Sequence, residues 1–413
     1  MSKKTVLLEV IILIVLSAFF IFYNFTAIPK FLTFDEIEFT KLALSLQDKP
    51  YIPYSLLATG HSTLYFYIIL LSLKIFGVSA FALRLPAAIF GLFSVFLFYF
   101  VIRELKNYEL KIKKYNVLPF LLTTILLSSR WFLNFSRFAF EPTFLLFLEL
   151  TSIYFLLKYF KELKWQYLIS CGLFAGLAFN SYTPGRIFFL LPLFFLTLKT
   201  LQTWKLYKLS YFIIPFLIII APLIIHLSTI KDTRIDQQFF LRNSEMTIDE
   251  KVDGLWHNIS STALMFFTKG DMNGRHNYPG KPALNPILAI LFIFGIIVAI
   301  KNKKSFHSQL FLLYFILSLF PTLMTYPWEN PNMLRTFTVI LPLIYFIGLA
   351  AVSITEKLKI KYVYLFFFLI IISSLYELRT YFKYQKIVFD DSFEIKYPLE
   401  KAIKMKNPYE KVK

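Results

Sequence analysis

The chain has 413 residues, of which 57% are apolar and 19% aromatic, and its formal net charge at pH 7 is +19. Ordinary globular domains are about 45–50% apolar, so this composition excludes a protein built mainly from water-soluble domains. The Lys and Arg residues stand in short clusters between apolar runs, which indicates membrane topology and argues against a nucleic-acid partner. The single cysteine, Cys171, excludes an internal disulfide.

Long apolar runs recur along nearly the whole chain, and a membrane-spanning helix needs about 20 such residues. Lys3 and Lys4 precede the first run, which we interpret as an uncleaved span that begins in the cytoplasm. We predict an all-α integral membrane protein with about eleven spans. In chain order these cover residues 5–28, 80–102, 116–134, 143–160, 167–182, 187–203, 210–228, 285–300, 309–326, 336–354 and 361–377.

The run from Ser62 to Gly77 decides the topology, because it is short and carries Lys74. If it lies in the outer interface without crossing, all basic clusters fall on the cytoplasmic side, as the positive-inside rule requires. These clusters are Lys3 with Lys4, Arg103–Lys114, Lys158–Lys164, Lys199–Lys208, Lys301–Lys304 and Lys357–Lys361. We therefore predict interfacial helices in the first external loop, a plasma-membrane domain of residues 1–377 and a short extracytoplasmic tail of residues 378–413.

The ionisable side chains outside the basic clusters are predicted to face mostly the external side. Such groups are costly at the ends of spans unless they are paired or solvated, so an active site is expected there. Asp35 and Glu36 follow the first span and either supply a general base with a partner that tunes it or cap a short helix. His61 either contacts a hydroxyl or phosphate group or is a surface bystander.

Three further charged residues lie at the starts of spans or in tight external turns. Arg84 opens the second span and either binds a lipid phosphate through its bidentate fork or anchors the helix. Arg137 and Glu141 share one turn, where they either pair with each other or contact substrate.

The remaining candidates lie in loops that are rich in Pro, Gly and Asn. Tyr182 and Arg186 belong to a Pro-Gly turn and are expected to line a polar cavity. Arg275 and His276 either bind an anionic or sugar ligand or lie on the surface, and Arg335 is expected to face a phosphate. The loop around Arg275 lacks the spacing of a calcium site, so no cofactor is predicted and dependence on a divalent metal stays open.

From Leu32 to Ala350 the pattern resembles membrane glycosyltransferases with the GT-C fold, in the group related to protein O-mannosyltransferases and lipid A aminoarabinose transferases. An acidic pair after the first span, a His before an interfacial helix, and Phe-Gly-Val-Ser-Ala-Phe-Ala-Leu-Arg-Leu-Pro opening a span carry the resemblance. It implies Asp35 as base, Glu36 as the next acid and Arg84 as the phosphate ligand. The usual Asp of the second loop is Glu141 here, and His61-Ser-Thr replaces His-Pro-Pro.

The resemblance implies a polyprenyl-phosphate sugar as donor and a hydroxyl-bearing acceptor, which is a protein, a lipid or a polysaccharide. The base removes the hydroxyl proton, and the anomeric configuration inverts. The alternative is a transporter or flippase, whose paired half-repeats and broken helices are not evident in the sequence.

Overall fold

The computed structural model describes residues 3–106, 110 and 117–405, and almost all of its regular structure is helical. Much of the predicted basic cluster Arg103–Lys114 lies outside the described residues. The α-helices are α1 (Lys3–Phe22), α2 (Phe34–Ser45), α3 (Leu64–Phe76), α4 (Ala80–Lys106), α5 (Leu118–Ser128), α6 (Arg130–Phe135), α7 (Pro142–Glu162), α8 (Trp165–Phe179), α9 (Leu190–Thr203), α10 (Ser210–Thr229), α11 (Thr233–Gln238), α12 (Ile248–Met265), α13 (Pro286–Lys301), α14 (Phe306–Leu323), α15 (Ile340–Thr355), α16 (Ile360–Arg379), α17 (Lys386–Ser392) and α18 (Leu399–Ala402). Two strands, β1 (Tyr54–Ser55) and β2 (His61–Ser62), form an antiparallel pair in which Ser55 lies opposite His61.

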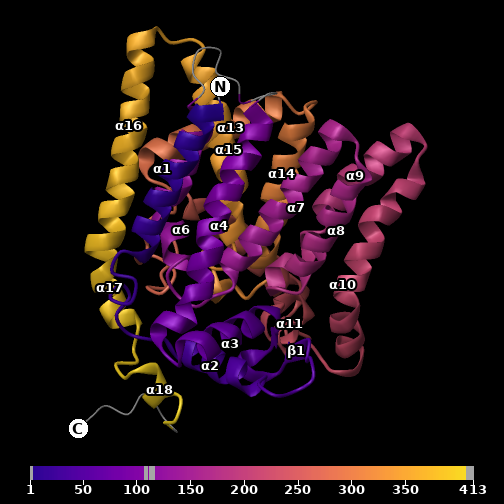
Figure 1. Ribbon diagram of the computed structural model, residues 1–413, viewed down its shortest axis with the longest axis vertical. Coiled ribbons are helices and arrows are strands. Elements are labelled where there is room, and N and C mark those ends of the chain that lie inside the picture. The colour runs from indigo at the N-terminus through magenta and orange to yellow at the C-terminus, as the bar shows by residue number, and fades with distance from the viewer. Residues whose placement is uncertain (1–2, 107–109, 111–116, 406–413) are drawn as a thin grey trace.

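Long helices form one bundle in which most of them run along its length (Figure 1). Among the described residues, eight helical segments are long and apolar enough to cross a membrane. The predicted spans 116–134, 167–182 and 285–300 coincide with the shorter apolar helices α5, α8 and α13, so the count of about eleven stays a prediction. The bundle confirms the predicted all-α membrane architecture.

The short helices α2 and α3 lie across the lower end of the bundle, beside the start of α4 (Figure 1). Helix α3 has 13 residues, fewer than the roughly 20 that a span requires. The connections α7–α8, α9–α10, α13–α14 and α15–α16 lie at the opposite end, together with the start of α1. The basic clusters in these connections therefore gather at one end, and the assignment of that end to the cytoplasm stays a prediction.

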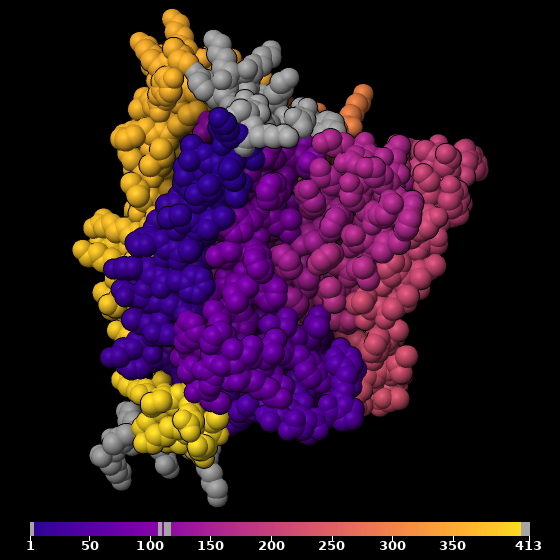
Figure 2. All heavy atoms as spheres, in the orientation of Figure 1, coloured from indigo at the N-terminus to yellow at the C-terminus, as the bar shows by residue number. Residues whose placement is uncertain are grey.

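The predicted tail begins inside a helix, because α16 runs on to Arg379 and is followed by a π-helix over Thr380–Gln385. Beyond α17 the chain forms a β-bridge with the segment before α2, in which Leu32 and Ile395 exchange both backbone hydrogen bonds at 3.1 and 2.9 Å. Figure 2 shows this yellow segment against the indigo N-terminal part. The tail therefore packs on the segment that leads into α2, the helix that carries Asp35 and Glu36.

Candidate active site

A polar cavity of about 550 Å³ lies among the short helices and loops at the lower end of the bundle. Helix α2, the β1–β2 hairpin, α11 and the loops before α13 and α15 contribute its walls. Six of the predicted site residues, from five segments of the sequence, meet there: Asp35, His61, Tyr182, Arg275, His276 and Arg335. The cavity is therefore the place where the structure collects most of the predicted site.

Asp35 lies in the first turn of α2, which begins where the sequence predicts a short helix. Thr33 caps this helix, because its hydroxyl accepts from the Glu36 amide at 3.1 Å and the Glu36 carboxylate accepts from the Thr33 amide at 3.1 Å. The Asp35 side chain is 37% exposed and accepts a hydrogen bond from Arg275 Nη1 at 2.5 Å. Its carboxylate therefore reaches the cavity, whereas its neighbour Glu36 serves the cap.

Glu36 and Arg84 form an ion pair that is fully buried and faces neither the polar cavity nor solvent. Arg84 donates from Nε and Nη2 to the two Glu36 oxygens at 2.7 and 2.9 Å, and both residues are 0% exposed. Its other donors bond the carbonyl oxygens of Pro29 and Phe31 at 2.6 and 2.7 Å. In this structure both groups join α2 to α4, and the contact of Arg84 with a leaving phosphate and the catalytic use of Glu36 stay predictions.

Arg137 is also buried, and it contacts neither Glu141 nor the cavity. Its guanidinium donates to the carbonyl oxygens of Phe20 and Ile21 at 2.7 Å and of Tyr23 at 2.7 Å. These carbonyls belong to the last turn of α1 and the residues after it, where the helix leaves its acceptors without partners. Arg137 therefore caps α1, so its predicted pairing with Glu141 is wrong, and its contact with substrate stays a prediction.

Glu141 pairs instead with His61, and this pair leads on to an arginine that the sequence analysis missed. Glu141 Oε1 lies 2.7 Å from His61 Nδ1, and Arg234 Nη1 lies 2.5 Å from His61 Nε2. Because an arginine only donates, Nε2 must accept, and the proton of the neutral ring then sits on Nδ1 and faces Glu141. The three side chains therefore form one chain that connects a buried carboxylate to a guanidinium on the cavity wall.

The electrostatics of this chain favour a neutral imidazole. Burial lowers the pKa of His61, Arg234 lowers it further, and the attraction of Glu141 offsets only part of the effect. For Glu141, burial raises the pKa, but the neighbouring His61 and Arg234 lower it overall, below the ordinary value. His61 is thus held as a neutral bridge next to an ionised Glu141 at pH 7.

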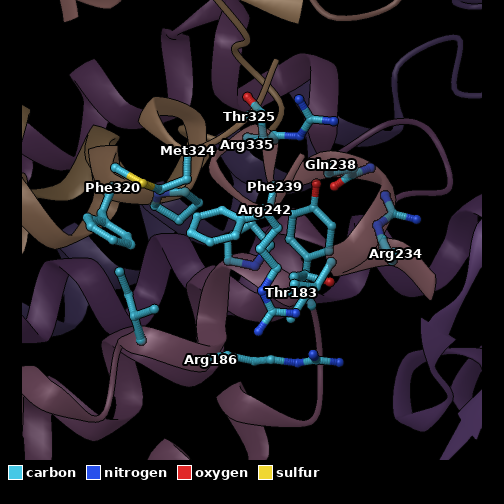
Figure 3. A pocket seen from close by; sticks show the side chains of 15 residues that line it. Thr183, Arg186, Arg234, Gln238, Phe239, Arg242, Phe320, Met324, Thr325 and Arg335 are labelled. Carbon is cyan, nitrogen blue, oxygen red and sulfur yellow. The ribbon is translucent and has the colours of Figure 1, made fainter. Parts of the chain in front are cut away.

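A second, mostly apolar pocket of about 240 Å³ adjoins the polar cavity. Its walls come from the turn Thr183–Ile187, α11 and the end of α14, and they include Phe239, Phe320 and Met324. In Figure 3 these apolar side chains lie on one side, while Arg234 and Gln238 lie on the other. Four residues line both cavities: Tyr182, Arg234, Gln238 and Arg335. Their shared wall joins an apolar compartment to a polar one.

The arginines near this wall differ in whether a carboxylate pairs with them. Arg186 pairs with Asp232, which also accepts from Tyr54 Oη at 2.9 Å and caps α11, and Arg335 pairs with Glu329. Burial raises the pKa of Asp232, but Arg186 lowers it overall. Within the described part of the chain, Arg234 forms no ion pair with a carboxylate, and its guanidinium contacts His61 and the Thr59 hydroxyl.

A signal for Arg234 was present in the sequence. Asp232 is a favoured helix N-cap, so Asp-Thr-Arg-Ile predicts a helix start within the long external loop. In such a helix Arg234 and Gln238 are four residues apart and share one face, which is the face that lines both cavities. The loop carries charges of both signs and no recognisable motif, so its composition does not distinguish Arg234 from the charges around it.

The loop around Arg275 is organised by Asp271. Its carboxylate accepts from the Met333 amide at 2.8 Å and contacts His276 Nδ1 at 3.0 Å, so it joins the two loops that precede α13 and α15. His276 lines the cavity but is mostly buried. Among the described residues no group of three or more His, Cys, Asp or Glu side chains is arranged to hold a metal ion.

Comparisons with known proteins bear on the fold. Residues 60–226 match a family model described as dolichyl-phosphate-mannose-protein mannosyltransferase. The structure is similar to two crystal structures of ArnT from Cupriavidus metallidurans, one bound to undecaprenyl phosphate and one in the apo state. Each comparison has a TM-score of 0.57 at 12% identity and covers 95% of this chain and 77% of that chain. No curated protein is similar to the chain in sequence. The chain therefore has the GT-C fold of membrane glycosyltransferases, as its sequence motifs indicate.

Proposed function

We propose that the protein is a membrane glycosyltransferase that moves a sugar from a polyprenyl-phosphate donor to a hydroxyl acceptor. One observation carries the proposal: Arg234, a guanidinium without a carboxylate partner among the described residues, stands where an apolar pocket meets a polar cavity. A lipid-linked sugar has the matching order of an apolar chain, a phosphate and a polar ring. The GT-C fold and the undecaprenyl phosphate bound to ArnT support this assignment.

The donor is placed by matching each of its parts to one compartment. Its first isoprene units occupy the apolar pocket beside Phe239 and Phe320, and its phosphate lies between Arg234 and Arg335. Guanidinium groups bind phosphate oxygens through charge-assisted hydrogen bonds. The sugar then extends into the polar cavity, toward Asp35.

Transfer requires one base and one stabilised leaving group. Asp35 accepts the proton of the acceptor hydroxyl, whose oxygen attacks the anomeric carbon as the bond from that carbon to the phosphate oxygen breaks. The bonding electron pair leaves with the polyprenyl phosphate, and Arg234 and Arg335 stabilise its charge. Direct attack inverts the anomeric configuration. In this scheme Arg275 orients Asp35, and the Glu141–His61 pair orients Arg234.

The position of the site in the membrane is part of the proposal. The polar cavity lies at the end of the bundle opposite the basic connections. Because the positive-inside rule assigns the basic connections to the cytoplasm, it assigns the end with the cavity to the extracytoplasmic face. The acceptor is then a protein, lipid or polysaccharide hydroxyl that reaches this face of the plasma membrane. No step of the scheme requires a metal.

The test uses the full chain in lipid nanodiscs with undecaprenyl-phosphate hexoses labelled in the sugar, and it measures release of the label to acceptor or water. Asp35→Asn should lower release by about 10²–10⁴-fold while undecaprenyl phosphate still binds. The matched control is Asp249→Asn, an exposed acid in the first turn of α12 that lines neither cavity.

Parent-like release by Asp35→Asn would remove Asp35 as base. If the parent releases no sugar but carries the intact donor across the membrane of proteoliposomes, the protein is a flippase and the proposed reaction is wrong.

A further inference from the structure

An exposed indole at the rim of the polar cavity has no place in the donor scheme. Trp328 lies in the short 3-10 helix Pro327–Glu329, is 76% exposed and lines the polar cavity without lining the apolar pocket. Exposure of so large an apolar surface beside a polar cavity indicates a binding surface.

This indole packs against one neighbouring ring, while the residue as a whole stays mostly exposed. Trp328 stacks on Tyr326, with ring centroids 4.3 Å apart and planes 21° apart. The Tyr326 hydroxyl accepts a hydrogen bond from Asn243 Nδ2 at 3.2 Å. After the 3-10 helix, Asn330 Nδ2 donates to Asn258 Oδ1 at 2.8 Å and to the Thr322 carbonyl at 3.0 Å, which anchors the segment. The stacked Trp328 and Tyr326 rings, called the platform below, are therefore held in place before a ligand binds. This lowers the conformational entropy that is lost on binding.

The cavity wall also offers side-chain amides that lack internal partners. The Asn273 Oδ1 accepts from the Arg275 amide at 3.0 Å, and the Asn332 Oδ1 accepts from the Leu334 and Arg335 amides at 3.1 and 3.0 Å. Within the described chain, neither amide nitrogen donates a hydrogen bond. Each –NH₂ group therefore keeps two donors for a ligand rich in oxygen atoms.

We infer that the acceptor is a carbohydrate whose ring stacks on Trp328 and whose hydroxyls bond to Asn273 and Asn332. This inference rests on the proposed function and narrows its acceptor class. Pyranose rings present C–H groups on their flat faces and hydroxyls around their edge, which matches a flat indole surrounded by amides.

In the reaction, an acceptor-sugar hydroxyl forms the new bond to the donor's anomeric carbon. Its proton passes to Asp35, and the polyprenyl phosphate leaves with the bonding pair. Trp328 holds the acceptor and is a positioning residue for this step.

The donor's own sugar is the competing explanation for the platform. The donor phosphate is assigned to the wall that lines both cavities, and Trp328 is absent from that wall. We therefore assign a ring stacked on Trp328 to the acceptor, and donor hydrolysis by Trp328→Ala, described below, distinguishes this assignment from a contact with the donor sugar.

The experiment measures binding of methyl glucosides, galactosides and mannosides, and of a Ser/Thr-rich peptide, to the full chain in nanodiscs by saturation-transfer NMR. At least one methyl hexoside should bind the parent, and Trp328→Ala should weaken it by about tenfold or more. Trp328→Phe, which keeps a flat ring, should retain most of the binding. The control Trp256→Ala removes another indole, 70% exposed on α12, and should change nothing.

Two further measurements separate the possible failures. Unchanged undecaprenyl phosphate binding and unchanged acceptor-free donor hydrolysis in Trp328→Ala support the inference, because the donor site is then intact. Slower hydrolysis would assign Trp328 to the donor sugar and overturn it. It is also overturned if the parent binds undecaprenyl phosphate but no hexoside, or binds only the peptide. If the parent binds neither lipid nor hexoside, the proposed function fails as well.

Discussion

Replacing Arg84 by alanine tests whether its guanidinium holds the fold together or contacts the donor. The substitution leaves the Glu36 carboxylate buried with only the amides of Thr33 and Ala139, at 3.1 and 3.4 Å, as partners. Removing one member of a buried ion pair costs about 3–5 kcal/mol, because the other charge stays desolvated. The carbonyls of Pro29 and Phe31 also lose their donors. We therefore expect a destabilisation near the upper end of that range.

The assay is the midpoint of thermal unfolding in detergent, followed by tryptophan fluorescence, together with undecaprenyl phosphate binding by the folded fraction. Arg84→Ala should unfold at a clearly lower temperature, whereas a double variant, Glu36→Gln with Arg84→Met, should recover part of the loss because no charge is left buried. Arg379→Ala removes an exposed arginine on α16 and serves as control. A parent-like midpoint for Arg84→Ala combined with lost lipid binding would refute the structural assignment and restore Arg84 as a donor ligand.

Three further predictions follow from the site and the topology. Because the pKa of His61 is lowered from its ordinary 6.5, the unfolded chain binds more protons just below that pH, so the parent should lose stability as pH falls from about 7 to about 5.5. His61→Gln should show a flatter pH profile of the unfolding midpoint, and an unchanged slope would contradict this origin. In a Cys171→Ala background, an impermeant thiol reagent should label Lys74→Cys but not Lys161→Cys on intact cells; the reverse pattern would invert the topology. Arg335→Gln should weaken undecaprenyl phosphate binding about tenfold or more, and an unchanged Kd would remove this arginine from the phosphate site.

The helical bundle could be predicted because apolar runs are local features of the sequence. The side of the membrane on which each end lies, and the placing of Ser62–Gly77 in the outer interface, stay predictions from the positions of the basic clusters. Placing Ser62–Gly77 in the interface predicts that the loops of Asp35, Arg275 and Arg335 lie at one end of the bundle. In the structure all three residues line one cavity. The resemblance to GT-C enzymes pointed to the same arrangement.

The partners of individual charges could not be predicted, because they lie far apart in the sequence. Arg84 is 48 residues from Glu36, and Glu141 is 80 residues from His61. Arg137 completes the end of a helix that begins the chain. A sequence shows that an arginine opens a span, but only packing shows whether a carboxylate, a carbonyl or an open cavity faces it.

The proposed reaction requires a polyprenyl phosphate to bind where the apolar pocket meets the polar cavity. A cryo-electron-microscopy structure of the full chain in nanodiscs with undecaprenyl phosphate tests it most directly. We predict phosphate density between Arg234 and Arg335, continued by density for the isoprene chain beside Phe239 and Phe320. Lipid phosphate density elsewhere on the protein, with the pocket empty, would contradict the account.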